Sequence, residues 1–263
     1  MTTDKQTLSK VLPVTRRQLL VKGAMASGGL ALGLALPGCS TSKSKMTESG
    51  AWQANAWLEI DTAGKVTFTL DRVEMGQGTY TGLTTLIAEE LDQAPDSIEV
   101  VFAPAAQVYR NKDYGLQITG GSNSISSSWL PMRQAAASAR AMVLEAAADV
   151  FQTNTSQLTL ADGKVSVVGT QKTIAIGELV GLASKKDIPD EPVLKASSDF
   201  KYIGKHSKRL DSLAKVKGEA GFGIDAVVEG MAYAVVIHAP AIGARLTGHD
   251  GSALSGRKGF IAV

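Results

Sequence analysis

The sequence predicts an α+β fold, with mixed sheets and packed helices in its first part and an incomplete α/β module after it. Three observations support this prediction. Short runs of alternating β-forming residues, such as 65–70, flank glycine-containing turns. Two stretches, 82–91 and 129–149, carry apolar or alanine-rich residues at helical spacing. The run 230–238 is rich in small and β-branched residues and indicates a strong strand.

The totals exclude several classes of protein. The chain has 263 residues, enough for one or two domains with a buried core. A formal net charge of +2 argues against a nucleic-acid partner, and 5% aromatic residues argue against base-stacking platforms. The single cysteine, Cys39, excludes an internal disulfide framework and an Fe–S cluster held by cysteines of this chain alone. His206, His238 and His249 form no close metal-ligand motif, so no metal site is predicted.

Residues 1–39 indicate an export signal. A polar region with two lysines precedes the pair Arg16–Arg17, and an apolar, Gly/Ala-rich run extends from Gly23 to Leu36. The arginine pair resembles a twin-arginine signal, whose pathway carries proteins that are already folded. An ordinary secretory signal with an incidental arginine pair is the alternative.

Cys39 is a candidate lipidation site. The stretch Leu36–Ser40 resembles a lipobox because the small Gly38 precedes the cysteine, although Pro37 departs from the usual small residue. We expect an exported, periplasmic protein. It is either soluble or held at the membrane, through a lipidated Cys39 or an uncleaved signal segment. The polar residues 40–50 are expected to form a flexible tether.

A glutamine between two glycines joins a predicted strand to a predicted helix. Gly76, Gln77 and Gly78 follow the β-like run 66–70 and precede the helix 82–91. Glycine lets the backbone take positive φ or lie against a bulky ligand, and Gln77 offers a donor and an acceptor. Free N–H groups at the start of the helix suit an anion or an oxo group. A tight turn with an exposed glutamine is the alternative, and the missing G-x-G-x-x-G argues against a Rossmann nucleotide site.

A serine-rich loop precedes the long helix. Two glycines, Gly120 and Gly121, are followed by Asn123 and by hydroxyl residues up to Ser128. Such a donor-rich loop before a helix N-terminus indicates a phosphate cradle, although it lacks the Lys-Ser/Thr step of a Walker loop. A serine-rich cap on a long helix is the alternative.

Charged residues and one proline lie on the two helices. Glu89 and Glu90 are adjacent, so their side chains point about 100° apart, and we expect mainly a solvated face with one partner contact. Arg133 and Arg140 are expected either near a ligand or in solvent. Pro131 is expected in the first turn of the long helix, where proline is tolerated.

Local patterns predict the remaining elements. They comprise two hairpins, further strands, one short helix and one linker. The hairpins pair 56–60 with 65–70 and 157–160 with 164–168, the strands are 98–102, 244–248 and 260–263, the helix lies in 173–184, and the linker or boundary is 187–192.

Taken together, these stretches resemble the molybdopterin-binding large subunits of the xanthine dehydrogenase and aldehyde oxidase superfamily, closest to the isoquinoline 1-oxidoreductase beta subunit group. Three stretches carry the cofactor-binding part of the resemblance, and three more resemble the family's α/β hammerhead module. They are Glu74–Thr79, Leu86–Leu91 and Gly120–Ser124, then Lys215–Gly218, Gly230–Ala234 and His238–Pro240. The resemblance implies a molybdopterin-binding subdomain over 51–195 and a partial hammerhead domain over 200–263.

The resemblance also implies a function. It implies a molybdenum-containing hydroxylase that oxidises aldehydes or N-heterocycles with water-derived oxygen, carries a molybdopterin cytosine dinucleotide and passes electrons to a [2Fe-2S] small subunit and a cytochrome acceptor. The residues that would approach the pterin and its metal ligands are Met75, Gly76, Gln77 and Gly78. The residues that would bind the dinucleotide phosphates are Gly121, Ser122, Asn123 and Ser124.

The sequence departs from the family in one important respect. The catalytic glutamate of the family lies in a C-terminal region that has no counterpart here, and Glu74, Glu89 and Glu90 do not match it. We therefore expect a fragment or split piece of the enzyme, inactive alone and completed by a second chain. The alternatives are a non-catalytic exported lipoprotein that uses the fold as a binding or assembly module, and a decayed gene product.

Overall fold

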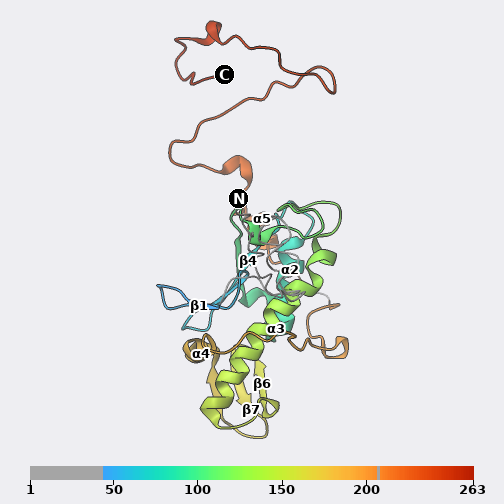
Figure 1. Ribbon diagram of the computed structural model, residues 1–263, viewed down its shortest axis with the longest axis vertical. Coiled ribbons are helices and arrows are strands. Elements are labelled where there is room, and N and C mark those ends of the chain that lie inside the picture. Colours follow the sequence, from blue (N-terminus) through green and yellow to red (C-terminus); the bar gives the residue numbers. More distant parts are fainter. Residues whose placement is uncertain (1–43, 206–207) are drawn as a thin grey trace, which may run out of the picture. The chain divides into compact units, whose positions relative to one another are not determined.

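The computed structural model describes residues 44–205 and 208–263. The chain divides into two units, Met1–Glu219 and Ala220–Val263. The predicted export signal, with its arginine pair and Cys39, lies outside the described residues and stays a prediction. The described part contains one mixed and one antiparallel sheet with packed helices, so the predicted α+β fold is confirmed (Figure 1).

A five-stranded mixed sheet forms one part of the first unit. Its first four strands are antiparallel neighbours, and the fifth pairs parallel with the fourth. The hairpin predicted around residues 61–64 is confirmed, with Leu58 opposite Phe68. In sheet order the strands are β1 (Lys45–Met46), β2 (Trp52–Gln53), β3 (Leu58–Ile60), β4 (Val66–Leu70) and β5 (Glu99–Phe102).

Helix α2 (Thr79–Leu91) connects the two parallel strands. Parallel neighbours need a crossover, and α2 supplies it, with Leu83 and Ile87 fully buried in the core. The helix starts three residues before the predicted position. The carboxyl ends of β4 and β5 therefore lie at the same edge of the sheet, and the loops that follow them start side by side there.

Helix α3 (Ser124–Phe151) is the longest element and links α2 to the second sheet (Figure 1). Its predicted start at residue 129 is wrong, because the serines 124–128 are already helical. Ser127 N–H donates to the Asn123 carbonyl at 2.9 Å, which closes the first turn. Pro131 consequently lies inside the helix and not in the first turn as predicted, where it removes one backbone hydrogen bond.

A three-stranded antiparallel sheet packs on the second half of α3. The predicted hairpin is confirmed, and its turn residues Asp162 and Gly163 both have positive φ, 46° and 72°, as a two-residue type I′ turn requires. Val165 and Leu179 are fully buried beneath α3. The elements are β6 (Leu158–Ala161), β7 (Lys164–Val167), β8 (Thr173–Ala175) and α4 (Ile176–Ala183).

Short helices complete the first unit. They are η1 (Pro95–Ser97), η2 (Gln107–Tyr109), η3 (Thr155–Gln157), η4 (Ser197–Asp199) and α5 (Ser212–Lys217).

No helix among residues 44–205 and 208–263 has both the length and the apolar character needed to span a membrane.

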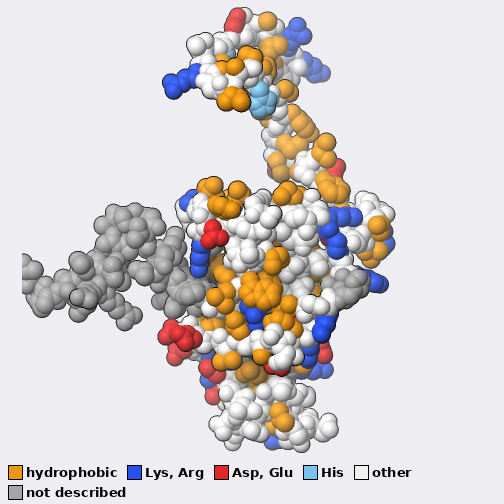
Figure 2. Space-filling model, turned by 90° about the vertical axis from the view of Figure 1, so that its right-hand side faces the viewer, with side chains coloured by type: hydrophobic (Ala, Val, Ile, Leu, Met, Phe, Trp, Pro, Cys, Tyr) orange, Lys and Arg blue, Asp and Glu red, His pale blue; other side chains and the backbone are white. Residues whose placement is uncertain are grey.

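The second unit contains no strand among its residues 220–263, only the short turns η5 (Gly223–Asp225) and η6 (Ser252–Leu254). The strands predicted at 230–238, 244–248 and 260–263 are therefore wrong for this structure. A strand needs a neighbour to pair its N–H and C=O groups, and no other segment of this unit supplies one. Apolar side chains remain on the outside, with Val235 91% and Ile237 93% exposed (Figure 2).

Two glycines of α4 offer a matched test of the packing between this helix and the β3–β4 turn. A Cβ on Gly177 would collide with the Thr62 carbonyl oxygen and lie 2.5 Å from Gly64 N, whereas a Cβ on Gly181 would meet no atom within 4 Å among the described residues. Gly177→Ala should lower the free energy of unfolding by about 1–3 kcal/mol. Gly181→Ala should raise it by about 0.5–1 kcal/mol, because alanine favours the helix. Urea unfolding of both variants measures the difference, and equal effects would contradict the close approach.

Candidate functional site

The two loops singled out in the sequence meet at one edge of the first sheet. The N–H of Val73 donates to Thr119 Oγ1 at 2.8 Å, and Arg72 Nη2 donates to Ser127 Oγ at 3.3 Å. This proximity follows from the parallel pairing of β4 and β5, whose carboxyl ends share that edge. The structure therefore brings the stretch 75–78 and the stretch 121–124 into one region.

The helices that follow these loops run parallel. A Cβ on Gly82 would lie 2.7 Å from Ile125 Cδ1, so α2 and α3 touch near their starts. Arg133 Nε donates to Glu90 Oε1 at 2.8 Å near the end of α2. The residues of each contact, Gly82 with Ile125 and Glu90 with Arg133, are 43 positions apart in sequence. Moving along α2 therefore moves the contact equally far along α3, so the two helices point the same way. Their N-termini, each with unsatisfied N–H groups and partial positive charge, therefore lie at the same end.

The N-terminus of α2 is capped by a carboxylate of its own loop. Glu74 Oε1 accepts from the N–H groups of Gly76 at 2.7 Å and Gly78 at 3.1 Å, and Oε2 accepts from that of Tyr80 at 3.0 Å. Burial raises the pKa of Glu74, but these N–H groups and Arg209 outweigh it and hold the pKa below its ordinary value. The prediction of free N–H groups at this helix start is therefore wrong for Tyr80, whose N–H is taken by Glu74.

The glycine loop itself is open on its outer side. Gly76 and Gly78 have φ of 112° and 94°, and a Cβ on either would meet no atom within 4 Å among the described residues. Gln77 braces the turn, because its Oε1 accepts from Met75 N–H at 2.8 Å and its Nε2 donates to the Val73 carbonyl at 3.1 Å. The side chain of Met75 is 68% exposed. A large ligand could thus lie against the loop backbone without displacing a side chain packed there.

The N-terminus of α3 differs because, within the described chain, no side chain caps it. Asn123 precedes the helix without a capping hydrogen bond, and its buried Oδ1 has no partner among the described residues. Gly121 and Ser122 take positive φ of 65° and 55°. The positive φ of Gly121 favours glycine, and a Cβ there would lie 2.6 Å from the hydroxyl of Tyr114, so a larger residue would also have to displace that side chain. This helix start retains N–H groups that an anion can accept.

Buried polar atoms lie beside the start of α3. Arg72 is 3% exposed, and its Nε has no partner among the described residues, nor has Ser128 Oγ. Arg72 Nη1 lies 3.2 Å from Asp71 Oδ1, and Trp57 Nε1 donates to Asp71 Oδ2 at 3.3 Å. Burial raises the pKa of Asp71 against the opposing effects of Arg72 and Trp57. Sequence reasoning missed Arg72, although its place directly after β4 is a signal that could have indicated it.

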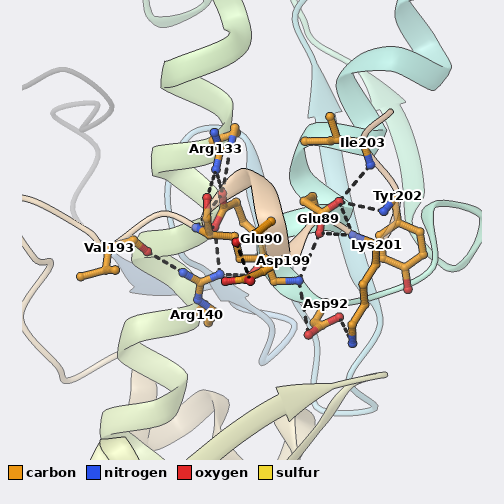
Figure 3. Close-up of polar contacts among 12 residues, drawn as sticks. Glu89, Glu90, Asp92, Arg133, Arg140, Val193, Asp199, Lys201, Tyr202 and Ile203 are labelled. Carbon is orange, nitrogen blue, oxygen red and sulfur yellow. Dashed lines mark hydrogen bonds and ion pairs between the residues drawn. The ribbon is translucent and has the colours of Figure 1, made fainter. Parts of the chain in front are cut away.

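The end of α2 is held by two buried carboxylates, Glu89 and Glu90, both fully buried (Figure 3). The prediction of a mainly solvated face is therefore wrong. Glu90 binds Arg133 through Oε1 and Arg140 through Oε2, each at 2.8 Å, so neither arginine is a free surface residue. The guanidinium of Arg133 also lies 4.9 Å from the ring centre of Phe200, a cation–π contact.

Glu89 points to a different segment of the chain. Its carboxylate accepts from the backbone N–H groups of Lys201 at 3.0 Å, Tyr202 at 2.8 Å and Ile203 at 2.9 Å, and from Lys195 Nζ at 3.2 Å (Figure 3). Burial raises the pKa of Glu89, but these donors outweigh it and hold the pKa below its ordinary value. Segment 195–203 is thereby fixed to α2.

The groups that remain available at the site indicate which class of ligand it can bind. No group of three or more His, Cys, Asp or Glu side chains within 44–205 and 208–263 is placed to hold a metal ion. The carboxylates of Glu74, Glu89 and Glu90 are each occupied by N–H groups or cations. The site therefore offers open glycine backbone, hydroxyl groups, one uncapped helix N-terminus and a buried guanidinium, which suit an extended anionic ligand.

Comparisons with known proteins give the family. A family model described as molybdopterin cofactor-binding domain matches residues 15–243. The chain is 34% identical over 230 residues to a membrane-bound aldehyde dehydrogenase (pyrroloquinoline-quinone) of Gluconacetobacter polyoxogenes, covering 84% of this chain and 29% of that protein. It is 28% identical over 279 residues to isoquinoline 1-oxidoreductase subunit beta of Brevundimonas diminuta, covering 92% and 36%.

A solved structure, quinoline 2-oxidoreductase from Pseudomonas putida 86, matches 47% of this chain and 15% of that chain, with 24% identity and a TM-score of 0.38. The chain thus spans about a third of the length of the curated relatives named above.

The buried carboxylate of Glu89 gives a stability prediction. Glu89→Gln places an amide NH₂ against backbone N–H donors and removes one of the two carboxylates that Lys195 contacts, the other being Asp92, so it should cost about 3–5 kcal/mol. Glu145→Gln, the same change at an exposed position of α3, should stay within about 0.5 kcal/mol. Urea unfolding at pH 7 measures both, and equal costs would contradict the buried contacts.

The pH dependence of the free energy of unfolding provides a second test of the Glu89 contacts. Because the pKa of Glu89 is lower in the folded chain than its ordinary value of 4.5, the unfolded chain takes up the proton first as pH falls. The contribution of Glu89 is fully present above pH 4.5 and is lost as pH falls through the lowered value. The free energy of unfolding should therefore fall more steeply below pH 4.5 in the unaltered chain than in Glu89→Gln. Parallel curves would contradict this.

Proposed function

The chain belongs to the family of molybdopterin cofactor-binding domains, and on that premise we propose that it holds a molybdopterin cytosine dinucleotide where its two loops meet. Family membership agrees with the resemblance found in the sequence. The observation that carries the proposal is the parallel pair α2 and α3, whose N-termini lie together behind an open glycine loop and a serine-rich turn.

The two loops suit different parts of such a cofactor, one the pterin and the other the phosphates. We assign the pterin end to the glycine loop 75–78, because the backbone of Gly76 and Gly78 is open to a flat, bulky group. We assign the phosphates to the start of α3, at 121–124, because Glu74 already takes the N–H group of Tyr80 in α2 and those of Gly76 and Gly78 just before the helix. The unpartnered Nε of Arg72 supports this assignment, since a buried guanidinium favours a nearby anion.

The cofactor, when bound, supplies the redox chemistry by which aldehydes or N-heterocycles are hydroxylated with water-derived oxygen. The residues of this chain bind and orient it. We propose that this stretch has no turnover by itself, because Glu74, Glu89 and Glu90 do not match the family's catalytic glutamate and are committed to structural contacts. Turnover would need a second polypeptide that completes the large subunit, a [2Fe-2S] small subunit and a cytochrome acceptor. A non-catalytic binding or assembly module on the same fold is the second candidate.

We also propose that the protein works in the periplasm. The arginine pair Arg16–Arg17 before an apolar run supports export through the twin-arginine pathway, which suits a cargo folded around its cofactor. Replacing both arginines by lysine should leave the protein in the cytoplasm, and cell fractionation measures this. Unchanged export would contradict the pathway. Mass spectrometry of the mature N-terminus, compared with Cys39→Ser, tests lipidation.

Cofactor content tests the binding proposal. The chain should be purified from a host that makes molybdopterin dinucleotides and assayed for molybdenum, pterin and released nucleotide. Gln77→Ala should retain roughly five-fold less cofactor, because one braced hydrogen-bonding group is lost from the loop. Gln171→Ala, the same change on an exposed turn, should retain as much as the unaltered chain.

Three results would contradict the proposal. A folded chain with no cofactor would favour the non-catalytic module. A chain that holds pyrroloquinoline quinone and no molybdenum would place the binding chemistry with the quinone that the aldehyde dehydrogenase relative carries in its name. Clear dye-linked aldehyde oxidation by the purified chain alone would overturn the assignment of binding without turnover.

A further inference from the structure

A distant segment, residues 208–211, lies across the glycine loop, and we call it the strap. Arg209 Nη1 donates to the Gly76 carbonyl at 2.7 Å, and Arg209 Nη2 donates to Glu74 Oε1 at 3.2 Å. The N–H of Leu210 donates to Thr81 Oγ1 at 3.0 Å, in the first turn of α2. The strap therefore contacts both the loop and the helix that the loop opens.

The guanidinium of Arg209 is itself held in one orientation. Its Nε donates to Asp211 Oδ1 at 3.0 Å and its Nη2 to Asp211 Oδ2 at 2.9 Å, a two-point contact. Hydrogen bonding to Arg209, followed by that to Lys215, holds the pKa of Asp211 far below its usual range, so this carboxylate stays charged. All three nitrogens of Arg209 are thus engaged, which a lysine cannot reproduce with its single nitrogen.

We propose that Arg209 is a positioning residue for the cofactor loop: it holds Glu74 on the first N–H groups of α2 and holds the Gly76 carbonyl, which fixes the shape of residues 74–78 before a ligand arrives. The loop needs such support because Met75, Gly76 and Gln77 are exposed and glycine has large conformational freedom. Ordering the loop in advance removes that entropy cost from binding. The role in binding rests on the proposed function, whereas the ordering of the loop does not.

A bland alternative is a surface ion pair of little consequence, since the side chain of Arg209 is 38% exposed. Two features argue against it. The side chain of Glu74 is only 6% exposed and accepts three backbone N–H groups, so its position decides the conformation of the loop. Arg209 also binds a backbone carbonyl of the loop, which an incidental ion pair would not do.

Hydrogen exchange measures the ordering directly and needs no bound cofactor. In the full chain, Arg209→Gln should speed amide exchange in a peptide covering 73–81 by roughly tenfold, because the charged partner of Glu74 is lost. Exchange in 83–91 should not change. Arg209→Lys should fall between, and Glu74→Gln should reproduce the loss. Lys208→Gln, which removes the same charge at an exposed neighbour, should leave 73–81 unchanged.

Unchanged exchange of 73–81 in Arg209→Gln would overturn the proposal. An equal rise in exchange throughout 83–91 would do so too, because it would show general destabilisation.

Cofactor content then separates the role of Arg209 in binding from the proposed function itself. A fall in content in Arg209→Gln supports positioning for binding. Unchanged content in Arg209→Gln but a loss in Gln77→Ala would overturn that role. Unchanged content in both variants, with faster exchange, would contradict the proposed function and leave the ordering role of the strap supported.

Discussion

The parallel alignment of α2 with α3 depends on one buried carboxylate, that of Glu90. A buried charge is tolerated only when its oxygens are hydrogen-bonded and its charge is matched. Glu90 meets this condition through two arginines of α3, which aligns the helices in parallel. The alignment places the two N-termini together at the far end of α2, roughly 16 Å from Glu90 at the helical rise per residue. The shape of the candidate site is therefore set at a distance from it.

Two helix N-termini at one place repel each other, because both carry partial positive charge. The surroundings of the two helix starts differ. Glu74 neutralises the start of α2 from within the loop, and Arg209 secures that carboxylate from outside. The start of α3 is left without a side-chain cap among the described residues, beside the buried Arg72. The pair therefore offers an uncapped helix start next to an open glycine loop, and under the proposed function the helix start takes the phosphates and the loop takes the pterin.

Local patterns predicted those parts of the fold that local forces determine. Both hairpins, α2 and β5 were predicted, because alternation and helical spacing reflect which face is buried. Glu89 and Glu90 contact mainly different segments of the chain, as expected of adjacent residues on a helix. Their burial was misjudged, because the partners of Glu89 lie more than 100 residues away. The run 230–238 was predicted as a strand and is not one in the structure. Residues that favour strands form one only where a neighbouring strand is present to pair with them.

The glycine-flanked glutamine was the strongest signal in the sequence, and the structure changes what that signal means. The motif alone is flexible: two glycines with positive φ around an exposed glutamine do not define one conformation. Its shape comes from Glu74, two residues before Gly76, and from Arg209, which is 133 residues from Gly76. Lys215 holds Asp211, Asp211 orients Arg209, and Arg209 fixes the loop. Candidate residues can thus be found by motif, whereas the geometry that would make them a binding site comes from charged contacts between distant segments.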